Sequence, residues 1–280
     1  WLDEFGDIDG IKSNAESIGG KVGENLRASL ETLDLAHQLV KIKTDVELDL
    51  GIEDLKVGEQ NSKELSKIYK ELEFNAWLQE VPERQATSPK INKSYKCITT
   101  KKDLKKVVKE ASKSDTVAID TETTGLDYID SELVGISISF NAGEGFYIPI
   151  KHNDESIIQL PLEDVINELK PLLESSEKKI IGQNIKFDKN ILMKYGLKIA
   201  SIKNDTMMMS YVLDASATRH NLDALASYYL GYKTSTYEDV AGKGAKQISF
   251  DEVPIDIATN YAAEDADITL RLYEELSPKL

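Results

Sequence analysis

Three groups of acidic side chains, far apart in the sequence, have the types and spacing that could hold metal ions. The first is Asp120-Thr121-Glu122-Thr123, which follows the short apolar run Val117–Ile119. Successive side chains of a strand alternate between its faces, so Asp120 and Glu122 are predicted to point to the same side. Two adjacent carboxylates repel each other unless a cation lies between them, and such hard ligands suit Mg²⁺ or Mn²⁺. The alternative is a solvated acidic turn, because D-x-E alone is a weak signal.

The second group is the run GQNIKFD at residues 182–188, which opens a predicted helix directly after the apolar pair Ile180-Ile181. Asp188 would lie in the first helical turn, with the amide side chains of Gln183 and Asn184 close by. The alternative is an ordinary helix start, with Asn184 as the N-cap and Asp188 complementing the helix dipole.

The third group is the run YAAED at residues 261–265. Residues four apart share a helix face, so Tyr261 and Asp265 are predicted to lie next to each other. Asp is unfavourable in the middle of an apolar helix and needs a reason there. The alternative is an exposed Asp265 beside a core Tyr261.

Taken in order, these groups resemble the 3′→5′ exonucleases of the DEDD type, in the subclass with Tyr before the last Asp. The resemblance implies a ribonuclease-H-like fold and two divalent metal ions, Mg²⁺ or Mn²⁺. It also implies that Asp120, Glu122, Asp188 and Asp265 are the metal ligands and that Tyr261 lies next to the attacking water. Tyr261 would orient the water, because its usual pKa of about 10 is too high for a base at neutral pH.

A wider similarity to the bacterial DNA polymerase I family covers residues 95–280 through the runs DTETTGLD, LVGISISF, IGQNIKFDKNIL, RHNLDALA, AGKGAKQISF and YAAEDADITLRLY. The runs LVKIKTDVEL and IYKELEFNAWL resemble the C-terminal end of the 5′-nuclease domain of that family. The similarity implies that Arg219 lies near the scissile strand and that Leu126 and Tyr237 pack against terminal bases. Thr123, Gln183 and Asn184 complete the predicted substrate-binding set. Ordinary core packing is the alternative for Leu126, Arg219 and Tyr237.

An α/β fold must position these groups: a ribonuclease-H-like mixed sheet flanked by helices, preceded by a small, mostly helical segment. Apolar periodicity predicts helices over residues 24–41, 62–78, 101–113, 162–173, 187–195, 206–213, 222–230 and 255–276. Strands are predicted over residues 116–119, 133–140, 145–150 and 179–181, the middle two as a hairpin, and residues 44–50 form a short strand or extended segment.

The length of 280 residues predicts two domains. Residues 81–93 contain Pro82 and Pro89 and have no apolar face, so they mark the boundary. We therefore predict the end of a 5′-nuclease domain at residues 1–80, a linker at 81–94 and an exonuclease domain at 95–280. The chain begins with Trp1 where a native product would begin with Met, so we expect a fragment that stops before the polymerase domain.

The net charge of −15, from 34 basic and 49 acidic residues, argues against indiscriminate duplex binding. A single-stranded or frayed 3′ end of DNA is the predicted partner, together with the polymerase domain of the same parent chain. No apolar run approaches the roughly 18 residues of a membrane span. A single cysteine, Cys97, excludes an intrachain disulfide, which is typical of a reducing bacterial cytoplasm. The three histidines lack the spacing of a zinc site.

The predicted function is a proofreading 3′→5′ exonuclease that releases nucleoside 5′-monophosphates. One alternative is a ribonuclease of the same DEDD group, against which the polymerase-like first 80 residues argue. The other is a catalytically silent scaffold, against which the presence of all four carboxylates argues.

Overall fold

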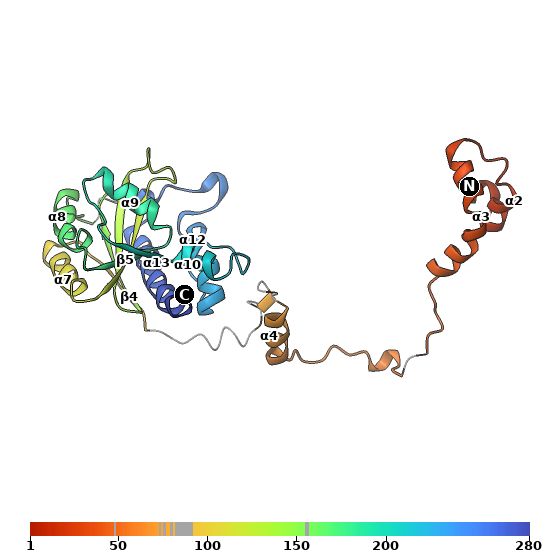
Figure 1. The fold of residues 1–280 in the computed structure, drawn as a ribbon, viewed down its shortest axis with the longest axis horizontal. Coiled ribbons are helices and arrows are strands. Elements are labelled where there is room, and N and C mark those ends of the chain that lie inside the picture. Colours follow the sequence, from red (N-terminus) through yellow and green to blue (C-terminus); the bar gives the residue numbers. More distant parts are fainter. Residues whose placement is uncertain (48, 73, 75–76, 79–80, 82–91, 155–156) are drawn as a thin grey trace. The chain divides into compact units, whose positions relative to one another are not determined.

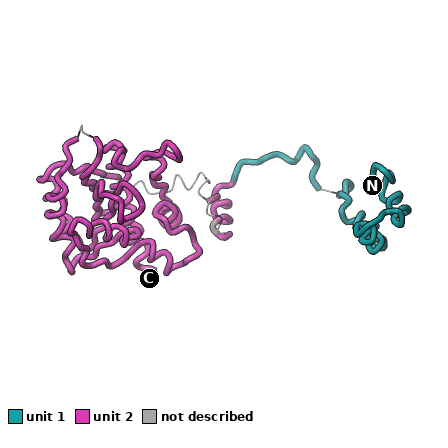
Figure 2. The backbone as a smooth tube through the Cα atoms, turned by 90° about the horizontal axis from the view of Figure 1, so that it is seen from above, with its two compact units in different colours: residues 1–60 teal, residues 61–280 magenta. Residues whose placement is uncertain are grey.

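The computed structural model describes residues 1–280 except 48, 73, 75–76, 79–80, 82–91 and 155–156. The chain divides into two compact units, residues 1–60 and residues 61–280 (Figure 2). The linker predicted at residues 81–94 falls largely outside the described residues, Pro82 and Pro89 included. Its last residue, Ser94, already belongs to a strand.

The first unit is helical, as predicted. It contains α1 (Leu2–Phe5), α2 (Ile8–Ser13), α3 (Gly20–Val40) and the 3₁₀ turn η1 (Ile52–Asp54). The strand considered for residues 44–50 is not observed in the described part of that segment. Its apolar side chains Val46 and Leu50 are 54% and 59% exposed. Alternation alone does not make a strand where no neighbouring strand pairs with it.

The second unit is built on a six-stranded mixed sheet. Its strands are β1 (Ser94–Cys97), β2 (Thr116–Thr123), β3 (Leu133–Ser139), β4 (Glu144–Pro149), β5 (Lys179–Gly182) and β6 (Ile202–Asp205), in the order β1-β4-β3-β2-β5-β6. Strand β3 is antiparallel to β2 and β4, and the other neighbours are parallel. The predicted hairpin of β3 and β4 is confirmed. Two edge strands, β1 and β6, were not predicted, because each is four residues long with little apolar alternation.

Among its described residues, the second unit has the helices α4 (Ser62–Glu71), α7 (Lys101–Ala111), α8 (Leu162–Leu173), α9 (Ile185–Lys194), α10 (Thr206–Leu213), α11 (Leu222–Leu225), α12 (Tyr237–Ala241) and α13 (Ile255–Leu276). The unit also contains the π-helix η2 (Ala226–Leu230) and the short 3₁₀ helices η3 (Gly244–Lys246), η4 (Phe250–Glu252) and η5 (Ser277–Lys279). Helix α4 ends earlier than the predicted helix 62–78, and α12 was not predicted. The predicted helix 222–230 is observed as α11 followed by the π-helix η2. The remaining helices of this unit lie close to their predicted ranges.

Helices cover both faces of the sheet (Figure 1). Helices α7, α8 and α9 share one apolar core with the strand residues Val117, Ile119 and Ile180. Helix α13 lies on the other face, where its Leu270 packs against Ala118 and Ile181. Alternation along β2 therefore directs Val117 and Ile119 to the α7–α9 side and Ala118 to the α13 side.

Helix α13 approaches the sheet closely because small residues line the contact. Gly145 of β4 lies under this helix, and a Cβ atom at Gly145 would come within 2.3 Å of the carbonyl oxygen of Ala263. Ala258, Ala262 and Ala266 are also completely buried. The small side chains allow α13 to bring its own polar residues directly over the strands.

Within the described residues, no helix is both long and apolar enough to cross a membrane.

Candidate active site

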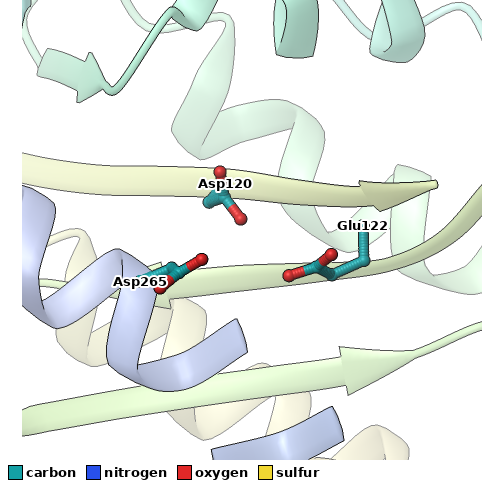
Figure 3. Close-up of side chains that lie close together, drawn as sticks. All are labelled: Asp120, Glu122 and Asp265. Carbon is teal, nitrogen blue, oxygen red and sulfur yellow. The ribbon is translucent and has the colours of Figure 1, made fainter. Parts of the chain in front are cut away.

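Three carboxylates from two distant segments meet on the α13 face of the sheet (Figure 3). Asp120 and Glu122 extend from β2 on the same face as Ala118, and Asp265 extends from α13 toward them. One oxygen from each carboxylate lies within 4.8 Å of the others. The arrangement follows from strand alternation on β2 and from the position of α13 above it.

The donor set fits a divalent cation. Glu122 and Asp265 are only 8% and 9% exposed, and Asp120 is half-buried. The Glu122 Oε1 atom is buried without a hydrogen-bond partner among the described residues. A buried polar atom without a partner is unfavourable, and several carboxylate oxygens together are the ligands that Mg²⁺ and Mn²⁺ prefer.

Burial and the charges of neighbouring carboxylates, Asp188 included, raise the pKa of all three carboxyl groups. For Asp120 and Asp265 the pKa lies well above its usual value, mainly because of burial and then because of the neighbouring carboxylates. For Glu122 burial, followed by the charge of Asp188, raises the pKa to about 8. The site is therefore unfavourable for three negative charges unless a cation compensates them.

Asp188 lies beside this group and joins it through Thr121. It is 2% exposed, and its Oδ1 accepts hydrogen bonds from the Thr121 backbone N–H at 2.9 Å and from the Thr121 hydroxyl at 2.6 Å. Burial raises the pKa of Asp188 to about 7, although the bonds from Thr121 act in the opposite direction. Thr121 points to the opposite face of β2 from Asp120 and Glu122, so Asp188 approaches the cluster from the α9 side.

Asn184 does not cap α9 with its side chain. Its backbone is left-handed, with φ 58°, and the side chain makes no capping bond. Asp205 caps the helix instead: its two carboxylate oxygens accept the backbone N–H groups of Asn184 and Ile185, each at 3.0 Å. Asn184 therefore occupies the N-cap position, as the alternative had it, but its side chain does not cap the helix. Its exposed amide makes no hydrogen bond within the described part of the chain.

Tyr261 lies four residues before Asp265 on α13 and remains protonated. Burial and the charges of Asp265, Glu122 and Asp120 raise the pKa of its hydroxyl. A hydrogen bond between Tyr261 and Asp265 lowers the pKa of the carboxylate in turn. The ring packs against Phe250, with centroids 5.8 Å apart. The hydroxyl can therefore donate a hydrogen bond at the cluster but is unsuited to accept a proton as a base.

The comparisons with known proteins agree with this geometry. Residues 95–280 match the family described as 3′-5′ exonuclease, and residues 1–63 match the C-terminal SAM fold of the 5′-3′ exonuclease. The chain belongs to the DNA polymerase I family. The DNA polymerase I of Pseudomonas aeruginosa is 40% identical over 95% of this chain and 30% of its own length. That of Borreliella burgdorferi is 34% identical over 100% of this chain and 33% of its own length.

The chain thus spans about a third of the length of the DNA polymerase I relatives that it matches. The predicted family and the predicted ribonuclease-H-like fold are confirmed. Residues 95–280 form a 3′-5′ exonuclease domain, which belongs to the hydrolases. Among solved structures, Trypanosoma brucei RNase D in complex with RNA U12 superimposes with a TM-score of 0.54 at 14% identity. This match covers 66% of this chain and 63% of that chain, and it shows a shared fold.

Two of the predicted substrate-binding residues, Thr123 and Tyr237, lie near the carboxylates. Thr123 directly follows Glu122, and Leu126, three residues further along the chain, is 96% exposed. Tyr237 is 36% exposed, and its ring centroid lies 6.3 Å from that of Tyr261. The negative charge of Glu122 contributes to the raised pKa of Tyr237, after burial. Leu126 is not an ordinary core residue, so the core alternative is wrong for it.

Both polar atoms of the Gln183 side chain form hydrogen bonds within the protein. Its amide nitrogen donates to the backbone oxygen of His220 at 2.8 Å, and its amide oxygen accepts from the Thr206 hydroxyl at 2.5 Å. The first bond fixes the backbone next to Arg219, whose side chain is exposed and has no ion pair in the described structure. Gln183 therefore supports the segment that carries Arg219, while Asn184 and Arg219 keep their polar groups available.

The sequence did not predict the functions of two polar residues of this site, Thr121 and Asp205. Thr121 holds Asp188, and the only local signal was its position between two acidic residues of one strand. Asp205 also caps α10, through the backbone N–H of Met207 at 2.9 Å. Its position directly before a predicted helix was a signal for capping, but its bonds to α9 depend on the packing of two separate segments.

A pH-dependence of stability follows from the raised pKa of Glu122. A carboxyl group whose pKa is higher in the folded than in the unfolded state stabilises the fold at low pH and loses this contribution as the pH rises. For Glu122 this loss of stability occurs in the pH window between the ordinary pKa of the group, 4.5, and its raised pKa of about 8. We expect the free energy of unfolding of metal-free wild type, relative to Glu122→Gln, to fall through this window.

Urea unfolding in EDTA at about pH 5 and about pH 8 measures that difference. Glu163→Gln, which changes an exposed glutamate of α8, is the matched control and should keep a constant difference from wild type. A wild type that gains stability relative to Glu122→Gln as the pH rises would contradict the prediction.

Proposed function

We propose that residues 95–280 remove nucleotides from the 3′ end of single-stranded or frayed DNA, releasing nucleoside 5′-monophosphates. Asp120, Glu122, Asp188 and Asp265 would hold two Mg²⁺ or Mn²⁺ ions. The observation that carries the proposal is the convergence of the carboxylates of Asp120, Glu122 and Asp265, together with the buried Oε1 of Glu122, which has no hydrogen-bond partner among the described residues. A protein does not gather buried carboxylates in this way without compensation by positive charge.

Each protein group has a separate part in this hydrolysis. Bound divalent ions would supply activation of water and stabilisation of the departing 3′-oxygen. Asp120, Glu122 and Asp265 provide the negative ligands from the α13 face, and Thr121 orients Asp188 at the α9 side. Tyr261 orients the attacking water by hydrogen bonding through its hydroxyl and does not remove a proton from it.

The substrate would be held by side chains around the cluster. Leu126 and Tyr237 offer apolar and aromatic surface to unpaired bases, and Arg219 and Asn184 offer donors to phosphate and sugar oxygens. The net charge of −15 disfavours broad contact with a duplex, so we propose that affinity depends on these few groups.

The organisation of the parent protein follows the same proposal. Residues 1–80 would be the C-terminal end of a 5′-nuclease domain, and residues 81–94 a linker whose last residue, Ser94, begins strand β1 of the exonuclease domain at residues 95–280. A polymerase domain of the same parent chain would supply primer ends for proofreading in the bacterial cytoplasm. Relatives that align with the whole of this chain are DNA polymerase I proteins.

A nuclease assay tests the proposal against its alternatives. DNA and RNA oligonucleotides, each labelled at the 5′ end, are incubated with Mg²⁺ or with EDTA. We expect metal-dependent shortening of single-stranded DNA from its 3′ end, with nucleoside 5′-monophosphates as products. Faster shortening of RNA would favour a ribonuclease of the DEDD group, and no cleavage of either substrate would favour a silent scaffold.

Metal binding should also appear as a gain in stability. Mg²⁺ or Mn²⁺ that binds only the folded cluster should raise the thermal midpoint, because ligand at about 100 times its Kd stabilises the folded state by about 2.7 kcal/mol. Differential scanning calorimetry with millimolar metal or EDTA measures the shift. The Asp120→Ala, Glu122→Ala variant, which lacks two ligands, should show no shift. An equal shift of the thermal midpoint in this variant would show that the metal binds outside the carboxylate cluster.

A further inference from the structure

The loop between β2 and β3, residues 124–132, carries exposed apolar side chains and lies close to Glu122 along the chain. It leaves β2 directly after Glu122 and Thr123. Leu126 is 96% exposed, Ile129 is 65% exposed and Tyr128 is 42% exposed. Three exposed apolar side chains in one short loop are an unusual surface for a protein with 30% charged residues.

Hydrogen bonds within the loop hold it in one conformation. At its base, the Thr124 N–H donates to the Glu132 carbonyl, and the Glu132 N–H donates to the Thr124 hydroxyl, each at 3.0 Å. At its tip, Asp127 accepts the N–H of Ile129 at 2.9 Å through its carboxylate and that of Ser131 at 2.8 Å through its carbonyl. These bonds close the loop at its base and form a turn at its tip.

Lys194, the last residue of α9, binds three carbonyl oxygens of this loop. Its Nζ donates to the carbonyls of Tyr128 at 3.1 Å, Ile129 at 2.9 Å and Ser131 at 2.6 Å. An ammonium group has three N–H donors, so the three carbonyls satisfy all of them. The neighbouring Tyr195 hydroxyl accepts the N–H of Leu133, at the start of β3, at 3.0 Å. The end of α9 therefore fastens both the loop and the strand that follows it.

The same helix carries Asp188 in its first turn. Helix α9 thus contacts the site at both ends: Asp188 lies beside the carboxylate cluster, and Lys194 holds the apolar loop. The loop is covalently continuous with Asp120 and Glu122, so its conformation determines where Leu126 and Ile129 lie relative to the reacting phosphate.

We propose that Lys194 is a positioning residue that holds loop 124–132 in the conformation in which Leu126 and Ile129 contact the unpaired bases at a nucleic-acid 3′ end. The inference rests on the exonuclease activity proposed above. A loop that is ordered before binding loses less conformational entropy when substrate arrives. Lys194 contacts no carboxylate of the cluster in the described structure, so it acts on binding of the substrate and leaves the chemical step unchanged.

The test compares Lys194→Met with Lys189→Met, which removes the same charge from the same helix. Lys189 faces a surface cavity that it lines with Glu174 and Met193, and within the described residues it makes no bond to the loop. Steady-state hydrolysis of a 5′-labelled single-stranded DNA oligonucleotide gives kcat and KM for each variant. We expect Lys194→Met to raise KM about five- to tenfold with kcat within about twofold of wild type, and Lys189→Met to leave both within about twofold.

Hydrogen exchange of the backbone amides of residues 124–132 gives a readout independent of activity. Lys194→Met should speed exchange of the Ile129 and Ser131 amides about tenfold, with the thermal midpoint close to that of wild type. Lys194→Arg, which keeps the charge and several donors, should have a KM and loop amide exchange rates closer to those of wild type than to those of Lys194→Met. Wild-type protein that cuts no DNA would overturn the proposed function. Active wild type with a Lys194→Met variant whose KM and loop exchange equal those of Lys189→Met would overturn this inference alone.

Discussion

The Asp120→Ala, Glu122→Ala double variant is expected to lose 3′-terminal hydrolysis and to keep its fold. These two residues supply two of the three carboxylates that meet at the candidate site. Loss of one key electrostatic contact in an active site commonly reduces kcat by about 10²- to 10³-fold, so removal of both ligands should reduce it by at least about 10³-fold. Hydrolysis of a 5′-labelled single-stranded DNA oligonucleotide measures the loss.

The fold should survive because the variant removes repulsion from a buried site. Both carboxyl groups have raised pKa values, chiefly through burial. The metal-free variant should therefore unfold at a temperature equal to or above that of metal-free wild type. A Glu163→Ala, Glu168→Ala variant removes two charges from α8 on the other face of the sheet and should cut DNA as wild type does. Near-normal cleavage by the Asp120→Ala, Glu122→Ala variant would disprove the assignment of the site.

The second large expected effect is a difference between variants of Asp265 and Tyr261, the two functional residues of α13. Asp265→Ala should lose metal binding and reduce the rate by at least about 10²-fold, because it removes a carboxylate ligand. Tyr261→Phe keeps the ring that packs against Phe250 and removes only the hydroxyl. It should bind metal as wild type does and cut about 10- to 100-fold more slowly, as expected for one hydrogen bond to a charged or reacting group.

Calorimetric metal titration and single-turnover cleavage together decide this division of roles. Tyr273→Phe, on the same helix, is the matched control for loss of a tyrosine hydroxyl and should match wild type in both measurements. If Tyr261→Phe lost metal binding to the same extent as Asp265→Ala, the proposed role of Tyr261 in orienting water would be wrong.

Local periodicity by itself predicts much of the candidate site. A strand alternates its side chains, so D-x-E after Val117–Ile119 had to present Asp120 and Glu122 on one face. A helix repeats about every four residues, so Tyr261 and Asp265 had to share a face. These relations hold within one element and need no knowledge of its neighbours. The order of the three motifs then identified the family, which the comparisons confirmed.

Tertiary structure alone decided which separate elements meet. The bond between Thr121 and Asp188 joins residues 67 positions apart, and no periodicity predicts such a pair. The strands β1 and β6 are too short for a local signal and exist because neighbouring strands supply their hydrogen bonds. The sequence gives no local signal for the long-range bonds of Asp205, Gln183 and Lys194. Their functions in capping α9, supporting the segment of Arg219 and holding loop 124–132 arise because folding brings distant donors and acceptors within bonding distance.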